Sequence, residues 1–190
     1  IGIIMDVVYN HTYYTEDSPF NKIVPGYYYR KDRYGNFSNG SGTGNEIASE
    51  RPMVRKFILD SVRYWAEEYH IDGFRFDLMA LLDRKTMAEV ERVLHGLDSS
   101  ILIYGEPWTG GISPLDPREQ MLKGRQRGMR IAVFNDHFRN AIKGDNDGSG
   151  RGFVSGAAGQ VLNIKRGIVG GIDYSEEFRD FASEPWETIN

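Results

Sequence analysis

The sequence contains no cysteine among its 190 residues. Disulfide bonds and thiolate metal sites are therefore excluded, although this absence does not identify the compartment. The chain also has no apolar run long enough to cross a membrane and no visible signal peptide. An excess of positive charge is missing as well, because the formal net charge is −4 at pH 7. We therefore expect neither a membrane nor a nucleic acid as a partner.

What the sequence does contain is the composition of a globular protein, with 40% hydrophobic and 26% charged residues in a length that suits one domain. Aromatic residues make up 13%, and several lie in segments that we predict to be loops. Aromatic rings pack well on the C–H faces of sugars, which favours a carbohydrate cleft. The alternative is that these rings cover the edges of the core. The loop aromatics are Tyr13, Tyr14, Tyr27, Tyr28, Tyr29, Tyr34, Phe37 and Trp108.

The chain alternates between apolar runs typical of strands and amphipathic stretches typical of helices. This order is typical of an α/β fold with parallel strands and crossover helices. The predicted elements are a buried strand at 1–8, a long polar loop at 12–50, a helix from Ser49 to about His70, a strand at 72–77, a helix at 83–97, a strand at 101–104, a short helix at 117–127, a strand at 130–134 and a short helix at 136–143.

Four predicted strands are too few for a closed (β/α)8 barrel, which needs eight strands and typically about 250 residues. The sequence is therefore compatible with the central part of a larger TIM barrel or with an open sheet. We favour the partial barrel, because the chain opens directly in a strand that we predict to be buried on both faces.

Two carboxylates, Asp77 and Glu106, each follow a short apolar run, in DGFRFD at 72–77 and ILIYGEPW at 101–108. Parallel strands present their carboxyl ends on one face of a barrel, so we expect the two groups to meet there. Cleavage of a glycosidic bond needs such a pair, one acting as nucleophile or base and the other as proton donor. For either motif alone, a structural ion pair is the alternative.

Arg75 precedes Asp77 by two residues, so both side chains project from the same face of a strand. The guanidinium can then keep the carboxylate ionised and oriented, as a nucleophile requires. Glu106 needs a raised pKa to act as an acid, for which a nearby anion and the apolar wall of Trp108 are candidates. At the end of the first strand, His11 could donate a hydrogen bond to a substrate hydroxyl, or it could be a capping or core histidine.

Taken together, three motifs carry a resemblance to a known family. DVVYNH at 6–11, GFRFD at 73–77 and the Glu of YGEPW at 104–108 resemble three of the four signature regions of the α-amylase family. That family comprises retaining α-glycoside hydrolases and transferases on a (β/α)8 barrel. YNHT, the stretch at 43–79 and GEPW are most similar to type I pullulanases, which are α-1,6 debranching enzymes, and the similarity covers essentially the whole chain.

The resemblance implies a role for each matching position at the reacting centre. Asp77 matches the nucleophile that forms the covalent glycosyl-enzyme, and Glu106 matches the acid/base. Arg75 matches the arginine beside the nucleophile, while Asp6 matches a structural aspartate at the site. The implied reaction is hydrolysis of α-1,6-glucosidic linkages in pullulan and branched α-glucans by a retaining double displacement.

The resemblance also implies residues that bind the α-glucan. His11 matches a histidine that contacts the sugar in subsite −1, and Tyr13 or Tyr14 is expected to stack on the same sugar. Trp108 lies where debranching enzymes place an aromatic near the +1 and +2 sugars. Asn10 matches a calcium-ligand position of some α-amylases, but no partner ligands can be identified in the sequence. We therefore expect that no cofactor is required and that calcium, although possible, has no support here.

The sequence departs from the family in one respect. The fourth signature region carries a His-Asp pair on the seventh strand, and no such motif occurs here. We therefore expect residues 1–190 to be the central part of the catalytic domain, from strand three to helix six, with strands one, two, seven and eight absent. The isolated piece is expected to be inactive. The alternatives are an isoamylase-like debranching enzyme, a glucan-branching enzyme, or an inactive glucan-binding fragment.

Overall fold

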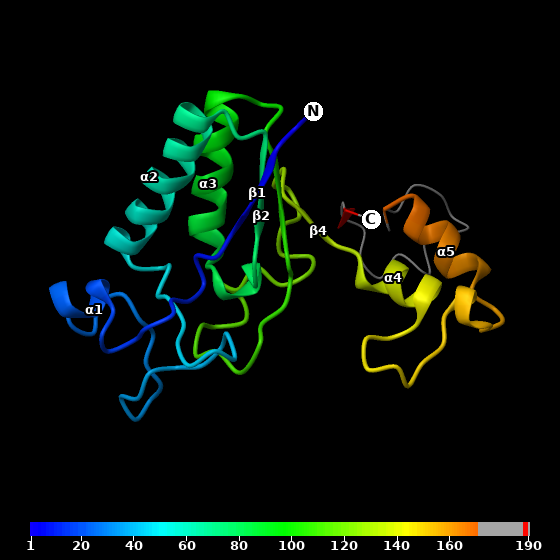
Figure 1. Ribbon diagram of the computed structural model, residues 1–190, viewed down its shortest axis with the longest axis horizontal. Helices are drawn as coiled ribbons and strands as arrows, with labels where there is room; N and C mark the ends of the chain where they lie inside the picture. The colour runs from blue at the N-terminus through cyan, green and yellow to red at the C-terminus, as the bar shows by residue number, and fades with distance from the viewer. Residues whose placement is uncertain (171–187, 190) are drawn as a thin grey trace. The chain divides into compact units, whose positions relative to one another are not determined.

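The computed structural model of the chain describes residues 1–170 and 188–189. The chain divides into two compact units, Ile1–Ile131 and Ala132–Asn190 (Figure 1). Each unit is described below by itself. Within the described residues, none of the helices is both long and apolar enough to span a membrane.

The first unit is built on parallel strands. Strand β1 (Ile4–Val7) pairs with β2 (Gly73–Phe76), and β2 pairs with β3 (Leu102–Gly105), both in parallel. Helices α2 (Pro52–Tyr69) and α3 (Arg84–Leu97) provide the crossovers and lie side by side on one side of these strands (Figure 1). The α/β class predicted from the alternation is confirmed.

The core of the first unit lies between strand β2 and the two helices. Phe74 and Phe76 of β2 are fully buried, which removes two aromatic side chains from water. Each helix presents an apolar stripe at i, i+3 or i, i+4 spacing, and burial of each such side chain contributes roughly 1.5–3 kcal/mol. The fully buried stripe residues are Val54, Ile58 and Val62 of α2 and Met87, Val90 and Leu94 of α3.

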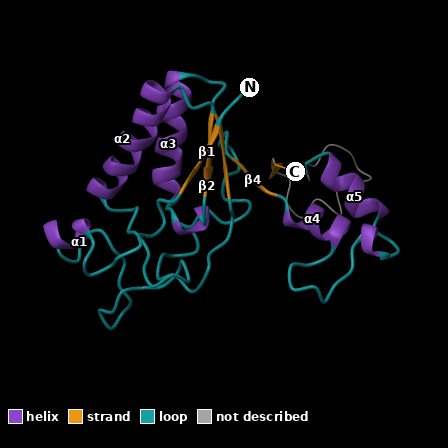
Figure 2. Cartoon of the chain, viewed as in Figure 1, coloured by secondary structure: helices purple, strands orange, loops and turns teal. Residues whose placement is uncertain are grey.

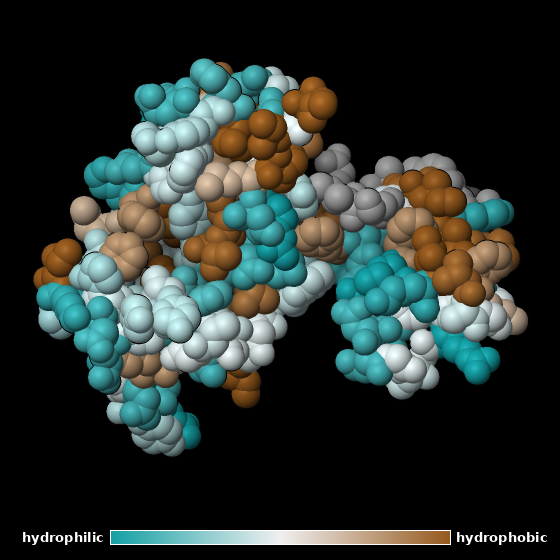
Figure 3. All heavy atoms as spheres, viewed as in Figure 1, coloured by the Kyte–Doolittle hydropathy of each residue, from teal (hydrophilic) through white to brown (hydrophobic). Residues whose placement is uncertain are grey.

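Strand β1 is shorter and more exposed than predicted. The sequence predicts a strand buried on both faces at 1–8, whereas β1 spans Ile4–Val7 and leaves Ile3 and Val8 exposed. Among the described strands β1 has only β2 as a neighbour, so its apolar side chains are not covered on the other side. Apolar atoms accordingly gather at the surface near the start of the chain (Figure 3).

Two predicted helix features are wrong. Helix α2 begins at Pro52 rather than Ser49 and has no side-chain cap, and the Ser49 hydroxyl instead donates to Asp83 Oδ2 (2.8 Å) and accepts from the Asp83 main-chain N–H (2.8 Å). The short helix predicted at 117–127 is absent, and turns replace it. Gly124 adopts a positive φ of 92°, which interrupts a right-handed helix at that point.

The long loop predicted at 12–50 is an ordered segment with its own secondary structure. It contains helix α1 (Pro19–Ile23) and antiparallel bridges that pair Tyr29 with Ile47 and Lys31 with Phe37. The Tyr29 ring is fully buried, and its hydroxyl donates to Ser18 Oγ at 2.6 Å. The segment is drawn mostly as loop in Figure 2, but through side chains such as that of Tyr29 it packs into the core.

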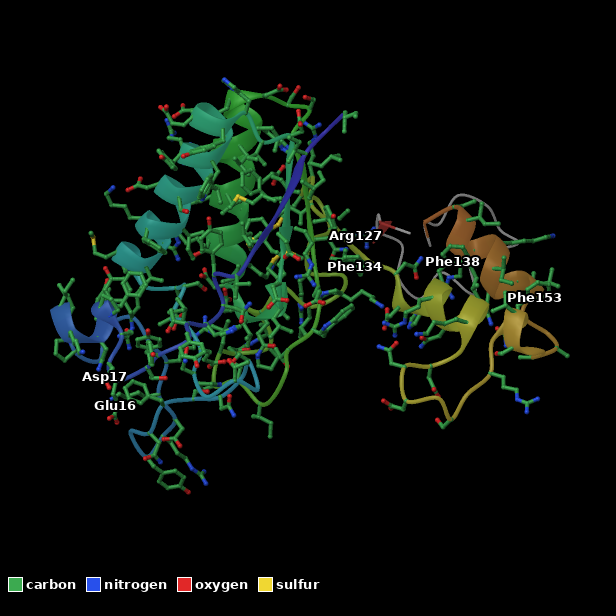
Figure 4. The ribbon with its side chains drawn as sticks, viewed as in Figure 1. Glu16, Asp17, Arg127, Phe134, Phe138 and Phe153 are labelled. Atoms are coloured by element: carbon green, nitrogen blue, oxygen red, sulfur yellow. The ribbon has the colours of Figure 1, made fainter. Side chains whose placement is uncertain are left out.

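The second unit contains strand β4 (Ala132–Phe134), which pairs in parallel with β5 (Thr188–Ile189). Helix α4 (Asp136–Lys143) begins after Asn135, whose side chain accepts from the Phe138 N–H, and a 3₁₀ turn (Phe153–Ser155) and helix α5 (Val161–Ile168) follow. Phe138 on α4 lies directly against Gly167 of α5 (Figure 4). The strand predicted at 130–134 is confirmed with a later start, and the helix predicted at 136–143 is confirmed with the same bounds.

We predict that Ser49→Ala destabilises the chain without shortening α2. The substitution leaves a buried carboxylate and a buried N–H of Asp83 without their hydroxyl partner, which should lower the free energy of unfolding by about 1–3 kcal/mol. Urea denaturation followed by circular dichroism measures this. Ser100→Ala is the matched control, because its hydroxyl also bonds an aspartate (Asp98, 2.7 Å) but is exposed. A smaller loss for Ser49→Ala than for Ser100→Ala would contradict the assignment.

Candidate active site

The candidate active site lies at the carboxyl ends of β1, β2 and β3. Asp6 on β1 is in register with Arg75 on β2, so their side chains leave the sheet at the same level. Asp77 directly follows β2, and Glu106 directly follows β3. The parallel order of the three strands thus brings together groups that are far apart in the sequence.

Gly105 allows β3 to deliver Glu106 close to β2. A Cβ atom at this position would lie 2.6 Å from the main-chain oxygen of Phe76 and 2.9 Å from the Cβ of Met79. Neither neighbour is the flexible end of a side chain, so any larger residue would push the strand end away. The glycine before Glu106 is therefore required by the close approach of the two strands.

The Arg75 guanidinium joins the carboxylates of the site. Its Nη1 donates to Asp6 Oδ1 at 2.8 Å and to Asp77 Oδ1 at 2.9 Å, and its Nη2 lies 2.7 Å from Glu106 Oε1. The side chains of Arg75, Asp77 and Glu106 are 18%, 25% and 17% exposed, whereas that of Asp6 is 65% exposed. The two candidate catalytic carboxylates therefore share one cation in a mostly enclosed place.

The pKa of Arg75 reflects this arrangement. Partial burial lowers it, but the hydrogen bonds to Asp6 and Asp77 and the charge of Glu106 outweigh burial, so the pKa is raised above its ordinary value. Arginine thus remains charged at any pH at which the protein is folded. A permanent cation therefore lies against all three carboxylates at this point.

Glu106 is held from a second side by the turn that follows Asp77. The main-chain N–H of Leu78 donates to Glu106 Oε2 at 2.9 Å. Leu78 has φ 39° and ψ 49°, a left-handed conformation that costs a non-glycine residue of order 1–3 kcal/mol. Further main-chain bonds join Glu106 N–H to Phe76 and Ala80 N–H to Glu106, which fix this turn against the end of β3.

Asp77 is likewise held from a second side, by Asn10. The Asn10 side chain is fully buried, and its Nδ2 donates to Asp77 Oδ2 at 3.0 Å and to the Asp77 main-chain oxygen at 2.8 Å. The Oδ1 of the same amide lies 2.6 Å from Nδ1 of His11. His11 therefore reaches the nucleophile candidate through Asn10 rather than directly.

The predicted aromatic residues are placed differently from one another. Tyr13 and Tyr14 are 89% and 61% exposed and pack edge to face with ring centroids 4.8 Å apart. Trp108 is partly buried, and the loop that carries it is seated on the long loop, where Gly111 N–H donates to Gly40 O at 2.8 Å. That Tyr13, Tyr14 and Trp108 stack on sugars stays a prediction.

Asn10 and the Leu78 N–H also contact Asp77 and Glu106, and neither contact is predicted from the sequence. Their hydrogen bonds span 67 and 28 residues, which no local motif reveals. Within residues 1–170 and 188–189, no group of three or more histidine, aspartate or glutamate side chains is arranged to hold a metal ion. That the protein requires no cofactor stays a prediction.

No protein-family model matches the chain, but individual proteins do. The pullulanase of Bacillus subtilis (strain 168) is 44% identical over 193 residues, which cover 100% of this chain and 26% of the relative. The solved pullulanase from Bacillus acidopullulyticus has a TM-score of 0.87 at 54% identity, over 90% of this chain and 21% of that one. The Paenibacillus barengoltzii pullulanase, solved with maltohexaose and α-cyclodextrin, has a TM-score of 0.91 at 44% identity, over 100% and 30%.

The chain belongs to the pullulanase family. It spans about a quarter of the length of its Bacillus subtilis relative. The resemblance read from the three sequence motifs is thereby confirmed. The parallel sheet with crossover helices agrees with the solved pullulanases over the aligned part of the chain.

We predict that Arg75→Lys destabilises the first unit even though the charge is conserved. A lysine ammonium is a point charge and cannot bond carboxylates on three strand ends in the fixed geometry of a guanidinium. The free energy of unfolding at pH 7 should fall by about 1–3 kcal/mol, as expected when charge-assisted hydrogen bonds are lost. Chemical denaturation measures the change.

Arg118→Lys is the matched control for this experiment, because Arg118 also bonds an aspartate, Asp116, but with its side chain 80% exposed. Exposed ion pairs contribute little, so no measurable change is expected. Equal effects of the two substitutions would show that Arg75 is an ordinary surface cation.

Proposed function

We propose that this chain supplies the nucleophile and the proton donor of a retaining glycoside hydrolase that cleaves α-1,6-glucosidic linkages in pullulan and branched α-glucans. The observation that carries the proposal is the pair of carboxylates, Asp77 and Glu106, on one arginine at the ends of neighbouring parallel strands. The identity with pullulanases over the whole chain supports the substrate class. So does the complex of one such relative with maltohexaose and α-cyclodextrin.

In the proposed reaction, Glu106 protonates the glycosidic oxygen while Asp77 attacks the anomeric carbon. The bond to the leaving glucan breaks, and a covalent glycosyl-enzyme on Asp77 forms. Glu106, now ionised, takes a proton from a water molecule that attacks the same carbon and releases the sugar with retained configuration. Arg75 holds Asp77 ionised and aimed, and the Leu78 N–H keeps Glu106 oriented.

We also infer that residues 1–190 form the part of a (β/α)8 catalytic barrel from the third strand to the sixth helix. The family's fourth signature region, with its third carboxylate, is not in this sequence. The chain covers 30% of the Paenibacillus barengoltzii pullulanase with which it aligns from end to end. The remainder of the same catalytic domain is therefore the partner that would complete the site, and the isolated piece is expected to be inactive.

The proposal is tested by grafting residues 1–190 into the Bacillus subtilis pullulanase in place of the segment with which they align. The graft should release maltotriose from pullulan, with the anomeric configuration retained by NMR. Asp77→Asn should lower kcat at least about 10³-fold, as removal of a nucleophile does in other hydrolases. Asp116→Asn, which removes an exposed carboxylate, should leave kcat unchanged and serves as the control.

Glu106→Gln separates the two carboxylate roles. Loss of the acid should lower kcat on pullulan about 10²–10⁴-fold. The first-turnover release of fluoride from α-maltotriosyl fluoride should be largely retained, because fluoride departs with little proton donation, although later turnovers stay slow without the base; Asp77→Asn should lose the first turnover as well. A Glu106→Gln graft that releases no fluoride in the first turnover would refute the acid assignment.

Other outcomes identify the alternatives. Cleavage of amylopectin without cleavage of pullulan would indicate isoamylase-like debranching, and new branch points in the products would indicate a branching transferase. A folded graft with neither activity would refute the hydrolase proposal. Glucan binding by the isolated 190 residues without turnover would then favour the binding-fragment interpretation.

A further inference from the structure

Asn10 follows β1 and is the one residue that contacts both Asp77 and His11 in the hydrogen bonds described above. We propose that Asn10 is a positioning residue that fixes the nucleophile and the sugar-binding histidine in a single geometry. This inference rests on the proposed function, because it assigns Asn10 a part in the same reaction.

The first end of the amide orients Asp77. Arg75 holds one carboxylate oxygen, Oδ1, and Asn10 holds the other, Oδ2. Donors on two different strand ends fix the plane of the carboxylate, which a single donor would leave free to rotate. Because Asn10 Nδ2 also donates to the main-chain oxygen of Asp77, the side chain is held relative to its own backbone. Such alignment matters, since a displacement of about 1 Å from the reacting geometry can cost about 10²-fold in rate.

The second end of the amide determines the state of His11. Two acceptors on Asp77 face one side of the Asn10 amide, so the NH₂ group must point to them and Oδ1 must point to His11. An amide oxygen only accepts, so the His11 ring must carry a proton on Nδ1 to make the 2.6 Å bond. Nε2 of the neutral ring is then an acceptor. His11 would therefore accept a hydrogen bond from a sugar hydroxyl rather than donate one.

Asn45 provides a matched comparison within the same part of the fold. It is also buried, its Oδ1 accepts from the Thr12 N–H at 3.0 Å, and its Nδ2 donates to Thr12 O at 2.8 Å. Both hydrogen bonds go to main-chain atoms, and neither goes to a carboxylate or an imidazole. Removal of the Asn45 amide should therefore cost stability to a similar extent without releasing Asp77 or changing the tautomer of His11.

The first test reads the His11 tautomer by ¹⁵N NMR of the imidazole nitrogens in the 190-residue chain, at a pH where histidines are neutral. His11 should be protonated on Nδ1. Asn10→Ala should shift it toward the Nε2 form, whereas Asn45→Ala should not. Asn10→Asp keeps an acceptor for His11 and should retain the Nδ1 form. A His11 that is protonated on Nε2 in the unsubstituted chain would overturn the inference.

The second test measures kinetics in the Bacillus subtilis graft. Asn10→Ala and Asn10→Asp each remove the donor to Asp77, so each should lower kcat about 10²-fold on both pullulan and α-maltotriosyl fluoride, with KM changed less than about 3-fold. Asn45→Ala should lose thermal stability without this loss of kcat. Full kcat in either Asn10 variant would contradict the proposal.

The two tests separate this inference from the proposed function. The NMR experiment needs no turnover, so it decides the arrangement of Asn10 and His11 even if the unsubstituted graft is inactive. An inactive graft with the expected tautomer pattern would refute the hydrolase proposal and leave the placement of Asn10 intact. An active graft with the opposite tautomer pattern would do the reverse.

Discussion

The site depends on one interaction, the contact of the Arg75 guanidinium with the carboxylates of Asp6, Asp77 and Glu106. The carboxylates carry like charges and repel each other where they converge in this partly enclosed site. A single cation between them offsets this repulsion. The guanidinium can do so because its donors lie in a fixed plane that matches carboxylates arriving from different strand ends. These bonds therefore link the ends of all three parallel strands through one side chain.

The support of this centre comes largely from the segment at 12–50. The buried Arg30 in that segment donates to Glu50 at 2.7 Å and to the main-chain oxygen of Leu81 at 2.8 Å, in the stretch that follows Asp77. Glu46 accepts from Ser113, in the loop that follows Glu106, and burial raises its pKa despite the opposing charge of Arg30. The segment at 12–50 thus bonds both the stretch that follows Asp77 and the stretch that follows Glu106. The same bonds hold the backbone of the segment in place.

The sequence predicts that Arg75, Asp77 and Glu106 lie together because the general geometry of parallel strands is enough to place them. Arg75 and Asp77 share a face through the two-residue period of a strand, and Glu106 follows from the rule that parallel strands end on one side. The sequence does not predict Asn10 as an orienting group, nor the Ser49 hydroxyl as a partner of Asp83. Those contacts arise only from tertiary packing, which brings together residues 67 and 34 positions apart. The predicted burial of β1 is wrong for the same reason, since the residues of a strand do not determine how many neighbouring strands it has.

The same arginine that assembles the site sets a condition on the proposed reaction. A general acid must hold a proton, yet Glu106 Oε1 lies 2.7 Å from Nη2 of the Arg75 guanidinium rather than facing a free space. Asp77 needs the opposite, because a nucleophile must be ionised throughout. Substrate binding therefore has to treat the two carboxylates differently, leaving Asp77 on Arg75 while Glu106 exchanges Arg75 Nη2 for the glycosidic oxygen. The Leu78 N–H can hold Glu106 during that exchange, and Asn10 holds Asp77, so each carboxylate keeps one contact that does not depend on the arginine.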